Sequence, residues 1–181
     1  KKNPAFPIAS MQRFKPWFVA MTVMNAQARS QGFEADKGLD QHIMNQATAA
    51  KKPSIGLETA EQQIALFDSM KMPAQIQLLN ETLFDASASK KELEQLHQLW
   101  KSGEVNDFEK QTVAKMRREY PDLYQSINVA RNRAWLPHLQ RLLDTAHEQD
   151  ALVVVGALHL LGPDGLVQQL QAKGYTVEQL K

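Results

Sequence analysis

Apolar residues recur at intervals of three and four along most of the chain, which is the spacing of one face of an α-helix. Proline, glycine and capping residues divide this pattern into successive segments. The helices that we expect begin near Pro16, Gly38, Thr59, Pro73, Ser89, Asp107, Leu123, Leu136 and Gly165. The expected segment from Leu136 runs to His147, and its register is disturbed by Pro137. The pattern therefore predicts many short helices.

Two short runs depart from helical spacing and predict strands. Ser54–Leu57 is a short apolar run after a proline, and Ala151–Val155 is continuously apolar and β-branched, as in a strand buried on both faces. A helix over Gly165–Lys173 and a further strand at Tyr175–Val177 would complete a βαβ-like unit. We therefore expect an α/β fold with a small, mostly buried sheet and many helices, in which Ala151–Ala157 is an interior strand.

Composition narrows the chemistry that the chain can perform. The formal net charge is +1, so no overall field favours nucleic acid or an anionic membrane as a partner. Cysteine is absent, which excludes thiol nucleophiles and leaves His, Asp and Glu as the metal ligands. No apolar run approaches the ~20 residues that a transmembrane helix needs. No repeat or linker divides the sequence, so we expect one domain over residues 1–181.

His159 and Glu58 are the first candidates for chemistry, because each follows an expected strand. Ligands bind beyond the carboxyl ends of parallel strands, where His159 would lie, with Gly156 three residues earlier to allow close approach of the backbone. The alternative is a hydrogen-bonded structural histidine. Glu58 stands at the entrance of a helix, so it is either a metal ligand or general base, or a carboxylate that complements the helix dipole.

Arg131 and Asn132 interrupt an apolar helical stretch, and Arg131 is suited to orient Glu58 or to bind an anionic substrate group. An ordinary surface ion pair is the alternative. Glu61 and Gln62 follow Glu58 within one helical turn and point either into the same cleft or into solvent. The chain has no zinc-peptidase helix signature, serine nucleophile elbow, phosphate loop or dinucleotide fingerprint.

Several sequence pieces together resemble the TraB/GumN family, also called TraB/PrgY/GumN. The matching pieces are Lys15–Trp17, Gly56–Gln62, Arg131–Trp135, and the tail Val153–Leu166 followed by Gly174–Val177. The resemblance implies an α/β fold related to erythromycin-esterase-like proteins and to Tiki-type metallopeptidases. In such folds, two Gly-x-x-His motifs and acidic residues build a site for a divalent metal, such as manganese, cobalt or zinc.

The resemblance assigns roles to residues of this chain. Glu58, His159 and Arg131 are expected to be catalytic, and His159 and Glu58 to bind the metal. Supporting positions around these ligands are expected for Glu61, Gln62 and Asn132. Ala130 stands where the family pattern leads us to expect glutamate, and the first Gly-x-x-His motif is missing. The chain therefore corresponds to the C-terminal two-thirds of the full domain.

The function that we expect is that of a metal-dependent, peptidase-like hydrolase whose site is incomplete in this chain. The alternative is a non-catalytic module of the cell envelope that binds a peptide, pheromone or saccharide-related ligand. The resemblance implies a bacterial periplasmic or envelope location, although Lys1–Pro4 lacks the apolar stretch of a signal peptide. We expect a peptide or small-molecule partner, no nucleic acid, and a homo-oligomer if another copy completes the sheet.

Overall fold

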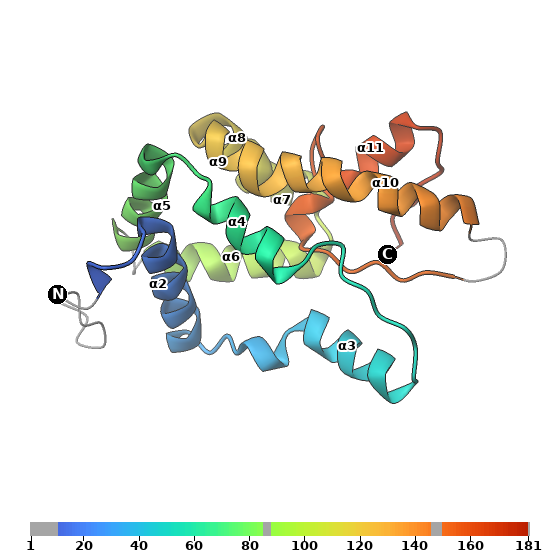
Figure 1. Ribbon diagram of the computed structural model, residues 1–181, viewed down its shortest axis with the longest axis horizontal. Helices are drawn as coiled ribbons and strands as arrows, with labels where there is room; N and C mark the ends of the chain where they lie inside the picture. Colours follow the sequence, from blue (N-terminus) through green and yellow to red (C-terminus); the bar gives the residue numbers. More distant parts are fainter. Residues whose placement is uncertain (1–10, 85–87, 146–149, 181) are drawn as a thin grey trace.

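A computed structural model of the chain describes residues 11–84, 88–145 and 150–180, which form a succession of mostly short helices (Figure 1). Their order is α2 (Pro16–Ser30), η1 (Ala35–Lys37), α3 (Leu39–Ala49), α4 (Ala60–Asp68), α5 (Met72–Phe84), α6 (Ala88–Ser102), α7 (Val105–Gln111), α8 (Val113–Glu119), α9 (Pro121–Tyr124), η2 (Gln125–Val129), α10 (Ala130–Thr145), η3 (Ala157–His159) and α11 (Leu166–Ala172). The expectation of many helices is confirmed.

Local sequence explains where several helices start. Pro16 and Pro121 occupy the first turns of α2 and α9, where a missing backbone N–H costs nothing. Thr59 and Gln62 form a reciprocal capping box at the start of α4. The expected helix over 165–173 is confirmed as α11, with Gly165 as its N-cap.

The chain does not break between residues 129 and 136, where separate helices were expected. A π-helical turn, η2, leads directly into α10, which continues through Pro137. Buried Asn132, Trp135 and Leu136 hold this part of the helix against its neighbours, so packing outweighs the backbone hydrogen bond that proline removes. The expected end of the helix at His147 lies outside the described residues.

The expectation of an α/β fold with a small buried sheet is wrong, because no strand forms in the described residues. Residues 151–156 are extended but unpaired, and Leu152 is 77% exposed. Ile55, in the other expected run, is 78% exposed, and 175–177 likewise forms no strand. A strand is stabilised by its neighbours, so apolar, β-branched sequence does not form one without a partner to complete the ladder.

Two apolar clusters lie on either side of the turn that carries His159. The first contains Val113, Tyr124, Val129 and Leu161. The second contains Trp135, Leu139 and Leu166, with Leu57 and Val155 packed against it. Helices α10 and α11 lie side by side (Figure 1), and the segment between them contributes Leu161 to the first cluster and Val155 to the surroundings of the second.

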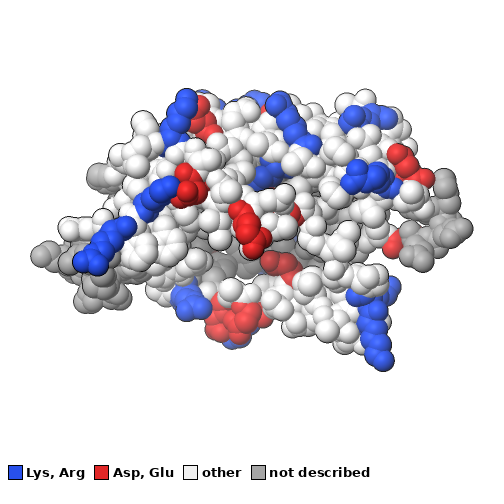
Figure 2. All heavy atoms as spheres, in the orientation of Figure 1, with Lys and Arg blue, Asp and Glu red and all other residues white. Residues whose placement is uncertain are grey.

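The N-terminal helices form a separate packing arrangement around α2 and α5. Trp17 stacks on Phe67 with ring centroids 5.6 Å apart, whereas α3 has no buried residue. Figure 2 shows basic and acidic side chains interspersed on the visible face, in keeping with the small net charge. Within the part of the chain that the structure describes, no helix has the length and apolar character to cross a membrane.

Candidate functional site

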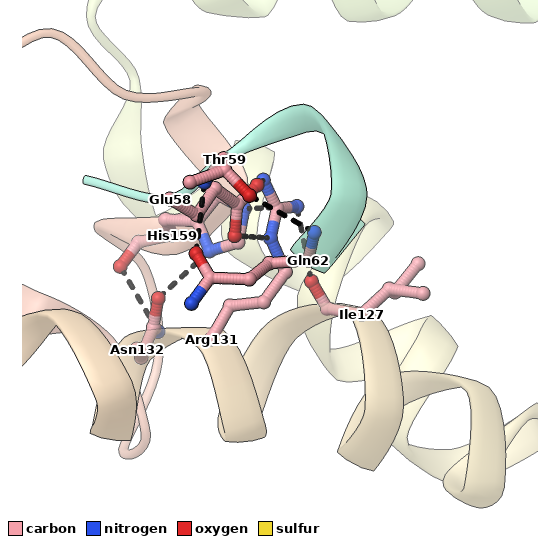
Figure 3. A network of polar contacts seen from close by, with 7 residues as sticks. All are labelled: Glu58, Thr59, Gln62, Ile127, Arg131, Asn132 and His159. Atoms are coloured by element: carbon pink, nitrogen blue, oxygen red, sulfur yellow. Dashed lines mark hydrogen bonds and ion pairs between the residues drawn. The ribbon is translucent and has the colours of Figure 1, made fainter. Parts of the chain in front are cut away.

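Three residues that are distant in the sequence meet at the start of α10. Arg131 lies in the first turn of that helix, Glu58 immediately precedes Thr59, the N-cap of α4, and His159 ends η3. Figure 3 shows their side chains pointing toward one another from these separate segments. The structure thus brings together the three residues to which catalytic roles were assigned, while the roles themselves stay predictions.

Arg131 and Glu58 form a two-pronged ion pair. Nη2 of Arg131 donates to Oε1 of Glu58 at 2.6 Å, and Nε donates to Oε2 at 3.1 Å. The two side chains are 18% and 20% exposed. A parallel pair of charge-assisted hydrogen bonds fixes the carboxylate in one orientation. Both oxygens of Glu58 are therefore engaged by a single guanidinium.

The hydrogen bonds of His159 fix its tautomer. Nδ1 lies 2.7 Å from Oδ1 of Asn132, which can only accept, so the proton is on Nδ1. Nε2 lies 3.1 Å from Nη1 of Arg131, which can only donate, so Nε2 keeps its lone pair. Burial, helped by the nearby Arg131 and opposed by Glu58, lowers the pKa of His159 from 6.5 to about 4. The imidazole is neutral at pH 7.

Asn132 organises the polar interior behind His159. It is fully buried, and its Nδ2 contacts the carbonyl oxygens of Asp164 at 2.8 Å and His159 at 3.2 Å, and Oδ1 of Asn128 at 3.1 Å. Asn128 donates to the carbonyl of Leu158, and Tyr124 donates to the carboxylate of Asp164. Asn132 therefore contacts His159 directly, while its expected role in supporting a metal ligand stays a prediction. Asn128 was not predicted to belong to the site, although its spacing of four residues from Asn132 places both amides on one face of a helix.

Trp135 forms an apolar wall for the ion pair and the imidazole. The guanidinium of Arg131 lies 4.7 Å from the centroid of its ring, and the ring of His159 lies 4.6 Å from it. A guanidinium stacked on an aromatic face gains a cation–π attraction. The ring of Trp135 therefore packs against both the guanidinium of Arg131 and the imidazole of His159.

An open pocket of about 260 Å³ lies beside these side chains. Its lining residues are Leu57, Glu58, Gln62, Leu66, Ala130, Arg131, Ala134, Trp135 and His138. The walls are mainly apolar, and the charged groups are confined to the Glu58–Arg131 pair. At Ala130 the pocket has a methyl group where the family pattern led us to expect a carboxylate. The pocket suits a small apolar group flanked by a polar one.

Gln62 and Glu61 both interact with the start of α4, and Gln62 also lines the pocket. The side-chain oxygen of Gln62 accepts from the backbone N–H of Thr59 at 2.8 Å, so Gln62 fixes the chain direction just after Glu58. Glu61 is exposed at the surface, and hydrogen bonds from its own backbone N–H and from Thr59 lower its pKa. These interactions stabilise the start of α4, and a role near a metal stays a prediction for both residues.

The residues present match a divalent cation in donor type but not in number. Nε2 of His159 and the carboxylate of Glu58 face the same point, and Asn132 holds the far ring nitrogen as in metal-binding histidines. Yet the described residues contain no group of three or more His, Asp or Glu side chains able to hold an ion. Three protein ligands are usual at a catalytic zinc. The guanidinium of Arg131 lies where the two donors meet.

The chain belongs to the TraB/PrgY/gumN family, which matches residues 1–179. It is 30% identical over 156 residues to a protein of Escherichia coli K12 described as uncharacterized protein YbaP, covering 86% of this chain and 56% of the relative. The same identity and coverage relate it to YbaP of Shigella flexneri. The chain thus spans about half the length of these relatives. No solved structure matches it.

Proposed function

We propose that this chain contributes to the site of a divalent-metal-dependent hydrolase of the peptidase-like class. The observation that carries the proposal is the convergence of Nε2 of His159 and both carboxylate oxygens of Glu58 on one cationic group. A neutral imidazole with one unprotonated nitrogen and a carboxylate are the donor types that bind manganese, cobalt or zinc. Membership of the TraB/PrgY/gumN family also supports the proposal of a metal-dependent hydrolase.

Each residue then has a separate task. His159 would coordinate through Nε2, and Asn132 keeps that nitrogen unprotonated because its Oδ1 accepts a hydrogen bond from Nδ1–H. Glu58 would coordinate or accept a proton, and Arg131 would orient it or bind an anionic substrate group. A bound divalent ion activates water and polarises a carbonyl group in hydrolases of this kind. The apolar pocket beside Trp135 would receive a side chain of the substrate.

Two protein ligands leave such a site incomplete, so the proposal requires a further ligand from outside the described residues. A second protein segment or another copy of the chain would provide it. In this proposal residues 1–181 act as one domain, and the bacterial periplasm or cell envelope is the location that the family resemblance favours. A peptide or another small molecule is the proposed substrate.

Calorimetric titration with Zn²⁺ or Mn²⁺ tests the proposal. The parent chain should bind the ion weakly through its two ligands, and His159→Ala should lose this binding because the coordinating nitrogen is removed. Glu61→Ala should bind more weakly than the parent by only a few-fold, because that residue acts around the ligands. His42→Ala, at an exposed position of α3, is the matched control and should bind as the parent does. If the parent and His159→Ala bind the ion with equal affinity, the proposal is refuted.

A second candidate is a non-catalytic binding module for a peptide, pheromone or saccharide-related ligand. The closed Glu58–Arg131 pair beside an open, largely apolar pocket favours it, because this arrangement is complete without an ion. Peptide hydrolysis separates the two candidates. A metal-loaded parent that cleaves no member of a diverse peptide library, but binds peptides with saturation, would favour the binding module.

A further inference from the structure

Residues 151–156 form an extended segment whose backbone is largely unpaired (Figure 1). Within the described part of the chain, no N–H or C=O group of residues 151–155 has a backbone hydrogen-bond partner. The first paired group is the carbonyl of Gly156, which accepts from the N–H of His159 at 2.9 Å. A row of unpaired donors and acceptors is the feature through which an exposed strand edge binds another chain.

The side chains of this segment divide between the apolar interior and solvent. Val155 packs against the second apolar cluster, whereas Leu152 and Val154 are 77% and 42% exposed. Residues two apart in an extended chain lie on one face, so Leu152 and Val154 lie on the face opposite to Val155. Runs of three or more exposed apolar residues usually serve a function, and Val153 completes such a run at 39% exposure.

The C-terminal end of the segment is held in place beside the candidate site. Asn128 donates to the carbonyl of Leu158 at 2.9 Å and so fixes the turn that follows the segment. Trp135 belongs to the second apolar cluster and lines the pocket, and Leu57 packs against that cluster and also lines the pocket. The same cluster therefore supports both the segment and the pocket. A segment that is extended before a partner arrives loses less conformational entropy on binding.

The composition of the segment defines the partner that it fits. Residues 151–158 carry no ionisable side chain, so neither an acidic nor a basic partner would gain an ion pair there. Unpaired backbone groups recognise the backbone of another extended polypeptide, and Leu152 and Val154 favour apolar, β-branched side chains beside them. A helical partner would leave the backbone of the segment unpaired. An extended peptide with apolar residues at alternate positions meets both requirements.

We propose that an extended apolar peptide binds along residues 151–156 by pairing with their backbone, so that one of its side chains reaches the pocket beside Trp135. This inference rests on the proposed function for the peptide as ligand, and it adds the conformation and the side chains of that ligand. Pairing needs no metal ion, and the fold of the chain itself stays helical. The second apolar cluster supplies the packing that a two-stranded ladder needs in water. A pairing this short gives a small interface, so weak binding is expected.

Fluorescence anisotropy with the full 181-residue chain tests the pairing in the presence of a chelator. The probe is a labelled synthetic peptide, Lys-Thr-Val-Thr-Val-Thr-Val-Lys, and the parent should bind it with saturation. The same peptide, N-methylated at all its central residues, keeps its side chains but has no backbone donor on either edge. It should bind at least about tenfold more weakly. Equal affinity for the two peptides would overturn the proposal.

A charge on the exposed face of the segment should also weaken binding. Leu152→Asp places a carboxylate beside the apolar peptide and should lower the affinity by about fivefold or more. Leu180→Asp is the matched control, because Leu180 is 89% exposed and lies outside the segment. Its affinity should equal that of the parent. A Leu152→Asp variant that binds the peptide as tightly as the parent would contradict the pairing.

Hydrogen exchange on the parent protein covers the case in which Leu152→Asp does not fold. Saturating peptide should slow the exchange of the backbone amides of residues 151–155 by about tenfold or more, because pairing protects them from water. Exchange in α3, which takes no part in the pairing, should stay the same. Unchanged exchange at 151–155 while the peptide is bound would refute the inference.

The pairing and the proposed function can fail separately. If both peptides bind equally while Zn²⁺ binds through His159, the pairing is refuted and the proposed function survives. If the peptide pairs with residues 151–155 while Zn²⁺ does not bind, the hydrolase is refuted and the pairing survives. A second copy of the chain is the alternative occupant. A dimer in sedimentation velocity without peptide, dissociated by Leu152→Asp, would identify that copy as the occupant and overturn the inference.

Discussion

His159 lies between an acceptor on one side of its ring and a cation on the other. Oδ1 of Asn132 accepts a hydrogen bond from Nδ1–H, and the positive charge of Arg131 opposes a second proton on Nε2. Burial acts in the same direction as Arg131, and together they lower the pKa of the imidazole to about 4, with Glu58 opposing. The residue therefore offers a lone pair at neutral pH and resists conversion to a cation.

The depressed pKa of His159 predicts a loss of stability in acid. The pKa is about 4 in the folded chain and near 6.5 when the residue is exposed, so the unfolded state takes up the proton first as the pH falls. The contribution of the neutral His159 to the free energy of unfolding is therefore fully present above about pH 6.5, and it is lost as the pH falls toward 4. Allowing for solvent screening, we expect a decrease of about 1 to 3 kcal/mol in the free energy of unfolding.

Urea unfolding at pH 7, 5.5 and 4 in the presence of a chelator measures this decrease. Carboxylates also titrate in this range, so the comparison is with His159→Asn, which keeps a side-chain donor near Asn132 but does not titrate. The difference between parent and variant should shrink as the pH falls. A difference that is constant with pH would show that His159 does not carry the effect.

Single residues of the site were more predictable from sequence than the contacts between them. Glu58, Arg131 and His159 were identified because charged residues next to apolar runs, within family motifs, are conspicuous. Asn128 and Asp164 were missed, because neutral amides and turn carboxylates are common on protein surfaces and their burial depends on packing. The sequence contains the chemical groups, and the tertiary fold decides which of them form hydrogen bonds with one another.

At the scale of elements, helices followed their sequence patterns and extended segments did not. Prolines and the Thr59–Gln62 capping box mark helix starts through local interactions, which sequence contains. A strand depends on a neighbouring strand, often one from a distant part of the chain, and residues 151–156 have no such partner among the described residues. The same limitation explains why the unbroken helix through Pro137 was not foreseen, since buried Trp135 and Asn132 stabilise it.

The turn before α11 predicts opposite outcomes for two glycine substitutions. A Cβ on Gly165 would lie 2.5 Å from the carbonyl oxygen of Leu161, which is backbone and cannot move aside. Gly165→Ala should therefore lower the free energy of unfolding by about 1 to 3 kcal/mol. A Cβ on Gly156 would meet only ordinary contacts, the nearest at 3.8 Å from His159, and its φ of −58° suits alanine.

Gly156→Ala is thus the matched control, with an expected change within about 0.5 kcal/mol. Denaturant titration monitored by circular dichroism compares the two variants with the parent. Equal destabilisation would show that Gly156 is needed for a close backbone approach, as its position three residues before His159 suggested. If neither substitution lowers the free energy of unfolding, the backbone at Leu161 can move to accommodate the added Cβ without loss of stability.

At the scale of the whole molecule, buried apolar residues are unevenly distributed. Among the described residues before 113, Ala20 and Met70 are the buried apolar side chains, whereas both apolar clusters lie from Val113 onward. The candidate site is built between those clusters, on α10 and the segment that precedes α11. Glu58 comes from the N-terminal half, and its ion pair with Arg131 connects the start of α4 to the better packed half.

This distribution predicts where the folded chain opens first. Helix α3 has 11 residues and no buried side chain, and it lies at the lower edge of the molecule in Figure 1. A helix of that length is marginal without packing, so local unfolding there should need little free energy. Trypsin should cut after Lys37 or Lys51, on either side of α3, at least about tenfold faster than after Arg131 or Arg141 in α10.

Intact-mass spectrometry over a time course of digestion identifies the first products. Cleavage after Lys37 or Lys51 should leave the fragment that contains α4 to α11 intact, because cutting α10 requires the opening of the apolar cluster that contains Trp135 and Leu139. Replacing Lys37 and Lys51 together by glutamine should slow the first cleavage without changing the melting temperature, since both residues are exposed. Early cleavage within α10 would contradict the uneven stability, and it would place the weakest part of the chain at the candidate site.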